Sequence, residues 1–258
     1  MVNSISNLER QNQIHQFILR NLRISLLELC DKFGVSEATA RRDLDTLAKE
    51  GKIQRVHGGA IIVSQAPTEL PILQRQDEQT LEKNLIGQAA AALVEDGETV
   101  FLGSGTTVLE AARVLRGRHH LTVITNSLPV VNVLAGVESI TVICLGGMLR
   151  ESELSFIGHI TEQALAEVRA DKAFIGTRAI DLEHGLTNEY LPETMTDRSI
   201  LKVAREIYIL ADHTKLGRTA TVLLAPLETI HTLVTDNAAS QVFTESIKMM
   251  NINVIRAS

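Results

Sequence analysis

The sequence predicts an α/β protein that joins an N-terminal winged helix-turn-helix domain to an open, largely parallel α/β sheet domain. Three observations predict this arrangement. Apolar residues recur at helical spacing through the first 50 residues, two β-prone runs then flank a His-Gly-Gly turn, and short apolar runs later alternate with helix-compatible segments. We place the first domain at residues 1–63, a linker at 64–78 that contains Pro67 and Pro71, and the second domain at 79–258.

The composition is that of a folded protein. With 45% hydrophobic residues in a chain of 258, substantial cores can be buried. No apolar run approaches the roughly 20 residues that cross a bilayer. The polar residues 1–10 are unlike a signal peptide, so we expect a cytoplasmic protein without a membrane partner. Cys30 and Cys144 lie in apolar segments, which predicts buried, reduced thiols rather than a disulfide or a zinc site.

The charge is distributed unevenly between the two domains. The net charge of −6 by itself argues against a nucleic-acid-binding protein. Residues 1–63, however, carry nine Lys and Arg against seven Asp and Glu, whereas the remainder carries 16 against 24. This distribution is compatible with DNA contact through the first domain alone.

The first domain begins with three predicted helices. Apolar spacing from Leu8 to Leu22 indicates the first helix. Ser25 is expected to cap the second helix at its start, and Gly34 is expected to end it in a left-handed turn. The third helix is expected to run from Ser36 to about residue 50. Two helices joined by a Gly-containing turn are typical of a helix-turn-helix motif.

The third predicted helix has the pattern of a DNA-recognition helix. Its apolar residues at helical spacing can face a core: Ala40, Leu44 and Leu47. Thr39, Arg41 and Arg42 project elsewhere, and a helix of this kind fits the major groove. The alternative is a solvated charged face in which Arg41 pairs with Asp45, four residues further on.

Residues 52–63 read as a small β-hairpin, which is the wing of a winged helix. Its basic side chains could lie on phosphates, whereas Asp43 cannot, and we expect Asp43 to pair with a basic residue of the wing. A role as a cap alone is the alternative for Ser36, while Glu37 and Thr39 lie where base edges are usually read. The candidate DNA-contacting residues are Ser36, Glu37, Thr39, Arg41, Arg42, Lys52, Arg55 and His57.

The second domain shows a strand–helix rhythm. A helical pattern between Leu81 and Leu93 is followed by β-branched runs, most of which lead toward helix-compatible segments. The expected strands lie at residues 99–102, 121–124, 140–145, 172–175, 206–210 and 232–234. Nearly continuous apolar strands of this kind are typical of a parallel sheet that is buried on both faces.

Small polar residues follow these strands, at the edge of the sheet where ligands bind. Residues 103–107 open a helix, so their N–H groups and the helix dipole suit a phosphate, and Lys215 can add a positive charge. A tight turn without a ligand is the alternative. The candidate effector-binding residues are Gly103, Ser104, Gly105, Thr106, Thr107, Thr125, Asn126, Ser127, Gly146, Gly147, Asp212 and Lys215.

Other polar residues leave their roles open. Arg178 and Glu189 flank the predicted pocket and could contact a ligand or form surface ion pairs. His213 and His231 have no second ligand at metal spacing, so we expect no metal site and no cofactor.

The first domain resembles the DeoR-type family of bacterial transcriptional regulators. The matching residues are Arg10, Ile14, Ile18, Ser36, Thr39–Leu44 and the run Arg55–Ala60. The second domain resembles the effector-binding domain of the same family at residues 104–107, 121–127, 145–147, 171–176, 185–187, 211–215 and 235–236. The resemblance implies a fold related to ribose-5-phosphate isomerases, used to sense a phosphorylated sugar. The family often has an acidic residue where this chain has Gly103.

We therefore expect a DNA-binding regulator, a repressor of a carbohydrate-utilisation operon whose operator binding is modulated by a phosphorylated sugar. We expect it to act as a homo-oligomer, a dimer or tetramer, and not as an enzyme. The first alternative is an isomerase-like enzyme with an attached DNA-binding domain, in which Asp212 and Lys215 are polar catalytic groups. The second alternative is an architectural DNA-binding protein that takes no ligand.

Overall fold

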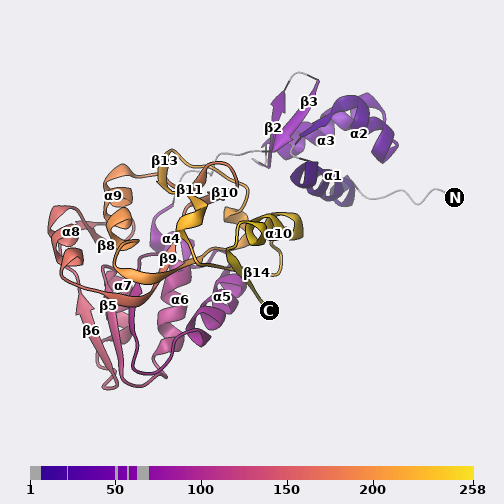
Figure 1. Ribbon diagram of the computed structural model, residues 1–258. Coiled ribbons are helices and arrows are strands. Elements are labelled where there is room, and N and C mark those ends of the chain that lie inside the picture. Colours follow the sequence, from indigo (N-terminus) through magenta and orange to yellow (C-terminus); the bar gives the residue numbers. More distant parts are fainter. Residues whose placement is uncertain (1–6, 22, 50–51, 57, 63–69) are drawn as a thin grey trace. The chain divides into compact units, whose positions relative to one another are not determined.

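The computed structural model describes residues 7–21, 23–49, 52–56, 58–62 and 70–258. The chain divides into two compact units, residues 1–65 and 66–258 (Figure 1). The division lies inside the segment expected as a linker. Part of that segment nevertheless belongs to the second unit, because α4 (Ile72–Arg75) folds there and buries Ile72.

The first unit is a winged helix, as the sequence predicts. It contains α1 (Asn7–Asn21), β1 (Arg23–Ser25), α2 (Leu26–Phe33), α3 (Glu37–Lys49), β2 (Ile53–Val56) and β3 (Gly59–Ile62). β2 and β3 form the expected hairpin, and β1, which was not expected, adds a third antiparallel strand in the order β1-β3-β2. The helices and the sheet enclose one core, formed by Ile14, Ile18, Ile24, Leu29, Ala40, Leu44, Leu47, Ile53 and Ala60.

Local sequence signals place the turns of this unit. Ser25 and Glu28 form a reciprocal capping box at the start of α2, and Gly34 ends that helix in the left-handed region with φ 62°. Gly59 allows β1 and β3 to approach, because a Cβ atom at this position would lie 2.1 Å from the backbone oxygen of Ile24. The capping box at Ser25 and the helix end at Gly34 confirm both caps that the sequence predicted for α2.

The second unit is built on seven parallel strands. They are β4 (Thr99–Leu102), β5 (Leu121–Thr125), β6 (Ile140–Cys144), β9 (Ala170–Gly176), β12 (Ala204–Leu210), β14 (Thr232–Asp236) and β15 (Asn253–Ala257), in the order β15-β14-β12-β9-β4-β5-β6. Six of them match strands expected from the sequence. β15 was missed because its pattern is only partly apolar, as befits an edge strand with exposed Asn253 and Arg256.

Helices cover both faces of this sheet. α5 (Thr80–Ala92), α6 (Thr106–Leu115) and α7 (Leu128–Leu134) pack on one face, where their apolar side chains meet Val100 and Leu102. Phe101 points to the opposite face and packs in a second core with Leu165 of α8 (His159–Ala166) and with α9 (Leu191–Ile200) and α10 (Gln241–Met249). Two buried faces explain why the strands read as continuous apolar runs.

Smaller elements are inserted after several of the strands. β7 (Met148–Arg150) and β8 (Ser155–Ile157) form a hairpin, while β10 (Ala179–Asp181), β11 (Gly185–Asn188) and β13 (Val222–Ala225) form an antiparallel sheet. Two short 3₁₀ turns are η1 (His213–Lys215) and η2 (Leu227–Thr229). These elements are not predictable from the sequence pattern, because strands of three or four residues carry too little periodicity.

Both cysteines are free thiols, but neither is buried. Cys30 is half-buried, and Cys144 is exposed at the end of β6, an outer strand of the sheet. The expectation of burial was therefore wrong for both cysteines, and for Cys144 the reason is that β6 lies at the edge of the sheet. In the described part of the chain, no helix combines the length and the apolar character needed to cross a membrane.

Candidate DNA-binding face and ligand pocket

The α3 helix of the first unit is buried on one side and open on the other. Ala40, Leu44 and Leu47 are fully buried in the core. Ser36, Glu37, Arg41 and Arg42 are exposed, and Thr39 is half-buried. The Ser36 hydroxyl accepts a hydrogen bond from the Thr39 backbone N–H at 3.4 Å, so it caps the helix only weakly. This arrangement leaves the N-terminal half of α3 free to enter a groove.

The charged partners of α3 differ from those expected. Asp43 pairs with Arg10 of α1 rather than with the wing, at 2.7 Å between Asp43 Oδ2 and Arg10 Nε. Arg41 pairs with Glu37 at 3.1 Å rather than with Asp45. Asp45 instead pairs with Arg55 of β2 at 3.3 Å. The expected wing partner of Asp43 was wrong, because the packed helices bring Arg10 to its carboxylate instead. The charged-face alternative paired Arg41 with Asp45, but Glu37 lies at the same four-residue spacing on the other side of Arg41 and pairs with it.

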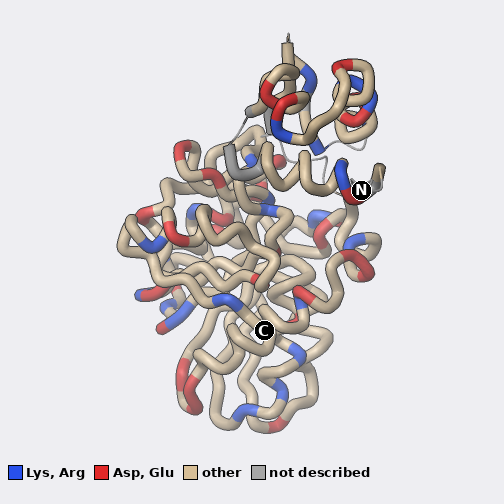
Figure 2. The backbone as a smooth tube through the Cα atoms, turned by 90° about the vertical axis from the view of Figure 1, so that its right-hand side faces the viewer, with Lys and Arg blue, Asp and Glu red and all other residues tan. Residues whose placement is uncertain are grey.

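The structure describes two of the three candidate basic residues of the wing. Lys52 is half-buried and Arg55 is exposed, while His57 lies outside the described residues. Figure 2 shows both basic and acidic residues over the first unit, so the charge of this unit is mixed rather than uniformly basic. Any attraction to DNA must therefore depend on where the exposed arginines lie, and Arg41 and Arg42 lie on the open face of α3.

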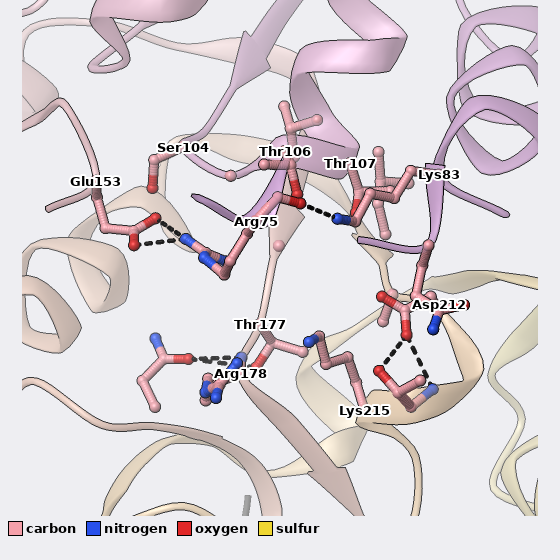
Figure 3. A pocket seen from close by; sticks show the side chains of 18 of the residues that line it. Arg75, Lys83, Ser104, Thr106, Thr107, Glu153, Thr177, Arg178, Asp212 and Lys215 are labelled. Carbon is pink, nitrogen blue, oxygen red and sulfur yellow. Dashed lines mark hydrogen bonds and ion pairs between the residues drawn. The ribbon is translucent and has the colours of Figure 1, made fainter. Parts of the chain in front are cut away.

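The second unit contains a cavity of about 470 Å³ beyond the carboxyl ends of β4, β9 and β12. Figure 3 shows the side chains of Arg75, Thr106, Arg178, Asp212 and Lys215 arranged around it. Its walls include the loop from β4 into α6, the turn into β10, the start of η1 and the stretch from Leu70 to Lys83. Its place is the one that open α/β sheets use for ligands.

The first turn of α6 forms one wall of the cavity. Gly105 precedes the helix with φ 111°, a conformation that L side chains rarely adopt, and no side chain caps the helix. Ser104, Thr106 and Thr107 line the cavity beside it. The N–H groups of a first helical turn have no partner within the helix, and together with the helix dipole they favour an anion.

Five basic side chains line the same cavity: Arg75, Lys83, Arg178, Lys215 and Arg218. Burial lowers the pKa of the Lys83 ammonium, and nearby Lys215 and Arg75 lower it further, while Asp212 opposes them. Burial and the neighbouring Arg178 lower the pKa of Arg218. Neighbouring positive charges thus disfavour the charged forms of Lys83 and Arg218, and an anion bound among them would relieve that repulsion.

Four acidic residues of the cavity lining have polar partners: Glu153, Glu193, Asp197 and Asp212. Glu153 pairs with Arg75, and Glu193 pairs with Arg150 of β7. Asn188 donates a hydrogen bond to Asp197 at 2.9 Å. Asp212 accepts hydrogen bonds from the backbone N–H of Thr214, at 2.9 Å, and from its hydroxyl. These contacts hold oxygen acceptors in defined positions around the cavity.

Six of the twelve candidate effector residues line this cavity: Ser104, Gly105, Thr106, Thr107, Asp212 and Lys215. The other six have contacts elsewhere. Gly103 donates its N–H to Phe174 at 2.9 Å. The Thr125 hydroxyl donates to Leu102 at 2.6 Å and accepts from the Ser127 N–H at 3.0 Å. Asn126 donates to the Phe156 carbonyl at 3.0 Å.

Gly146 and Gly147 also lie apart from the cavity lining. Thr161 donates to the Gly146 carbonyl at 2.9 Å, and a Cβ atom on Gly147 would lie 2.1 Å from the Thr161 hydroxyl oxygen. These glycines follow β6, which is separated from β4 by β5 in the sheet. Strand ends of similar composition therefore have different surroundings, because the cavity opens at only some of them.

Several lining residues were not singled out from the sequence. Arg75 lies in the segment expected as a linker, Lys83 in the helix after it, and Asn188 in a short strand. None of them belongs to a motif, so no local signal marks them. Arg178, whose role the sequence left open, lines the cavity, whereas Glu189 is not part of the lining. Among the described residues, no group of His, Cys, Asp and Glu could hold a metal ion.

Comparison with known proteins assigns both units. Residues 10–66 match the family described as the DeoR-like helix-turn-helix domain, and residues 78–237 match the DeoR C terminal sensor domain. The chain belongs to the DeoR family. It is a DNA-binding transcriptional regulator, as the resemblance in its sequence implied.

DeoR-family relatives align with nearly the whole chain. The transcriptional regulator IolR of Bacillus subtilis is 33% identical, over 92% of this chain and 94% of that protein. The lactose phosphotransferase system repressor of Lactococcus lactis is 36% identical, over 84% of this chain and 86% of that protein. A partial likeness is also found to ribose 5-phosphate isomerase A of Methanocaldococcus jannaschii, with 22% identity, a TM-score of 0.39 and coverage of 52% and 53% of the two chains.

Proposed function

We propose that this DeoR-family regulator represses a carbohydrate-utilisation operon and that a phosphorylated sugar, bound in the cavity of the second unit, changes its affinity for operator DNA. The first turn of α6 carries the proposal, because it opens into the cavity beside Lys83 and Lys215. A phosphate is the anion that such a helix start and such charges suit best.

The rest of the cavity supports a sugar attached to that phosphate. Its volume of about 470 Å³ is within the ordinary range for small-molecule sites. Asp212 and Asn188 supply carboxylate and amide oxygens, which accept hydrogen bonds from hydroxyl groups. A ligand with an anionic end and several hydroxyls matches this division of the lining.

The DNA-binding side of the proposal rests on α3. Ser36, Glu37, Thr39, Arg41 and Arg42 lie on or beside its open face, and Lys52 and Arg55 of the wing are proposed to contact phosphates. We further propose that the protein binds as a dimer or tetramer, since one recognition helix reads too few bases to select an operator, and two half-sites double the contacts. We also propose that it acts in the cytoplasm, where operator DNA lies.

The test uses the intact chain and a DNA duplex that the chain itself selects from a random-sequence pool. Fluorescence anisotropy then measures the DNA affinity with glucose 6-phosphate, fructose 1-phosphate, ribose 5-phosphate or glycerol 3-phosphate. We expect at least one of them to change the affinity by about fivefold or more. The unphosphorylated compounds are the control. DNA binding that ignores every phosphorylated compound would favour an architectural protein without a ligand.

We also propose that the cavity senses its ligand without converting it. An assay of aldose–ketose interconversion with glucose 6-phosphate and ribose 5-phosphate, the two aldoses among these compounds, tests this point. Turnover by the intact chain that is lost in Lys215→Ala would show an isomerase with an attached DNA-binding unit. We expect no turnover above the uncatalysed rate, while binding of the ligand persists.

A further inference from the structure

Along the chain, the stretch from Leu70 to Arg75 lies between the first unit and the residues that form most of the cavity of the second unit. Ile72 is buried, and its backbone N–H donates to the Ser152 carbonyl at 2.7 Å. The Arg75 side chain donates from Nε to the Leu70 carbonyl at 2.8 Å. Residues 70–75, here called the entry segment, are thus fastened to the turn between β7 and β8.

Arg75 links this entry segment to the cavity. Its guanidinium pairs with both carboxylate oxygens of Glu153, and both side chains are almost completely buried. In Figure 3 the Arg75 side chain lies between Glu153 and the side chains of Thr106 and Lys83. Its backbone carbonyl accepts a hydrogen bond from Lys83 Nζ at 2.6 Å. Arg75 therefore contacts Leu70 within the entry segment and Glu153 in the β7–β8 turn, and it also lines the ligand cavity.

Anion binding in this cavity would compete with Glu153 for Arg75. A guanidinium binds carboxylate and phosphate oxygens with the same paired geometry, so a phosphate at the start of α6 is a rival acceptor. Glu153 also lines the cavity, where its negative charge would oppose an incoming anion. The two effects favour the same change, because the free energy of anion binding is most favourable when the Arg75 side chain leaves Glu153.

We propose that Arg75 exchanges the Glu153 carboxylate for the anionic group of the effector, and that this exchange alters the attachment of the entry segment and so transmits occupancy toward the DNA-binding unit. The proposal rests on the function proposed above, because it assumes a phosphorylated ligand in this cavity. It assigns Arg75 as a ligand-contacting residue and Glu153 as the residue that holds Arg75 when the ligand is absent. Coupling of this kind requires an element with two attachments that ligand and DNA both bias.

Substitutions of the pair in the intact chain test the exchange. Arg75→Gln should weaken binding of the responding sugar phosphate by about tenfold, and the DNA affinities with and without saturating ligand should become nearly equal. Glu153→Gln should strengthen ligand binding by about threefold and shift the ligand-free DNA affinity toward the ligand-saturated value of the unmodified chain. Isothermal titration calorimetry and anisotropy give the two quantities.

Glu98→Gln is the matched control. Glu98 pairs with Lys172 at 2.7 Å in the same unit, and neither residue lines the cavity. This variant should keep both the ligand affinity and the DNA response. The proposal is overturned if Arg75→Gln binds the ligand and responds to it like the unmodified chain, or if Glu153→Gln binds it more weakly. If the unmodified chain itself binds none of the four phosphorylated compounds, the proposed function fails first.

Amide hydrogen exchange of the unmodified chain tests the entry segment even if the Arg75 variant does not fold. Adding the responding sugar phosphate should change exchange of the Ile72 amide, which donates to Ser152, by about threefold or more. Inorganic phosphate should produce a smaller change in the same amide. Unchanged exchange at residues 72–75 and 150–155, at a ligand concentration that alters DNA binding, would refute the proposal.

Discussion

Asp43 on the recognition helix accepts a hydrogen bond from Arg10 on α1, with 2.7 Å between Asp43 Oδ2 and Arg10 Nε. A second Arg10 nitrogen lies 3.2 Å from Asp43 Oδ1, and Gln11 donates to the same oxygen at 2.9 Å. Hydrogen bonding to Asp43 raises the pKa of Arg10. Asp43 is therefore a support that fixes the recognition helix against α1, although it is adjacent in sequence to the arginines that face outward.

We predict that Asp43→Ala destabilises the first unit. The substitution leaves Arg10 without its carboxylate, and loss of hydrogen bonds to a charged group in a largely buried setting costs about 2 kcal/mol. Denaturant unfolding followed by circular dichroism measures the free energy of unfolding. Glu37→Ala is the control, since it removes the exposed pair with Arg41 and should cost about 0.5 kcal/mol or less. Equal effects of the two variants would contradict a supporting role for Asp43.

We predict that Arg42→Ala weakens DNA binding by about tenfold or more without changing ligand-induced thermal stabilisation. Arg42 is exposed on the open face of α3, and no described contact makes it part of the core. If it contacts a phosphate, the slope of log affinity against log salt should also fall by about 0.9. Arg113→Ala, at an exposed arginine of α6, is the control and should leave DNA affinity unchanged.

Thr106→Val should blunt the response to the sugar phosphate and leave ligand-free DNA binding intact. The side chain is nearly isosteric, but its hydroxyl is lost at a buried position in the cavity wall. We expect ligand affinity to fall by about tenfold, the cost of one good hydrogen bond. Thr122→Val, in β5 and away from the cavity lining, provides the comparison. A normal response in Thr106→Val would place the anion elsewhere.

The stability of the second unit should depend on pH through His213 and Asp236. His213 Nδ1 lies 3.0 Å from Asp236 Oδ1, and this hydrogen bond raises the pKa of His213 above its usual 6.5. Hydrogen bonds from the same histidine lower the pKa of Asp236 against the opposing effect of its burial. The protonated histidine is thus favoured in the folded chain. Its contribution is complete below pH 6.5 and is lost as the pH rises through the raised value.

We therefore expect His213→Gln to destabilise the chain more at about pH 5.5 than at about pH 8.5, by about 1 kcal/mol or less because the ring is partly exposed. The Asp236 contribution is lost only in acid, below the ordinary aspartate pKa of 3.8. Thermal unfolding of both proteins across the pH range measures the difference, and an NMR titration of His213 measures its pKa. A pH-independent difference would contradict the pairing.

Much of the architecture could be predicted from local pattern. Ser25 and Gly34 mark the ends of α2, and β4 was expected at the residues it occupies, Thr99–Leu102. The same approach missed β15, whose side chains are mostly exposed or half-buried and so lack an apolar run. It predicted the start of α6 as an anion site because strand end, glycine and helix start are consecutive in the chain.

Pattern along the chain was enough to specify the domain types, the family and the loop at residues 104–107, because periodicity, caps and turns act between near neighbours. Only the tertiary structure decided which side chains pair with one another over long distances along the chain. Arg75 meets Glu153 across 78 positions, and Asp43 meets Arg10 across 33. No local rule selects such pairs, since many arginines and carboxylates have the right chemistry and only the packed elements bring particular ones within bonding distance. The composition of the cavity is accordingly a property of the folded chain.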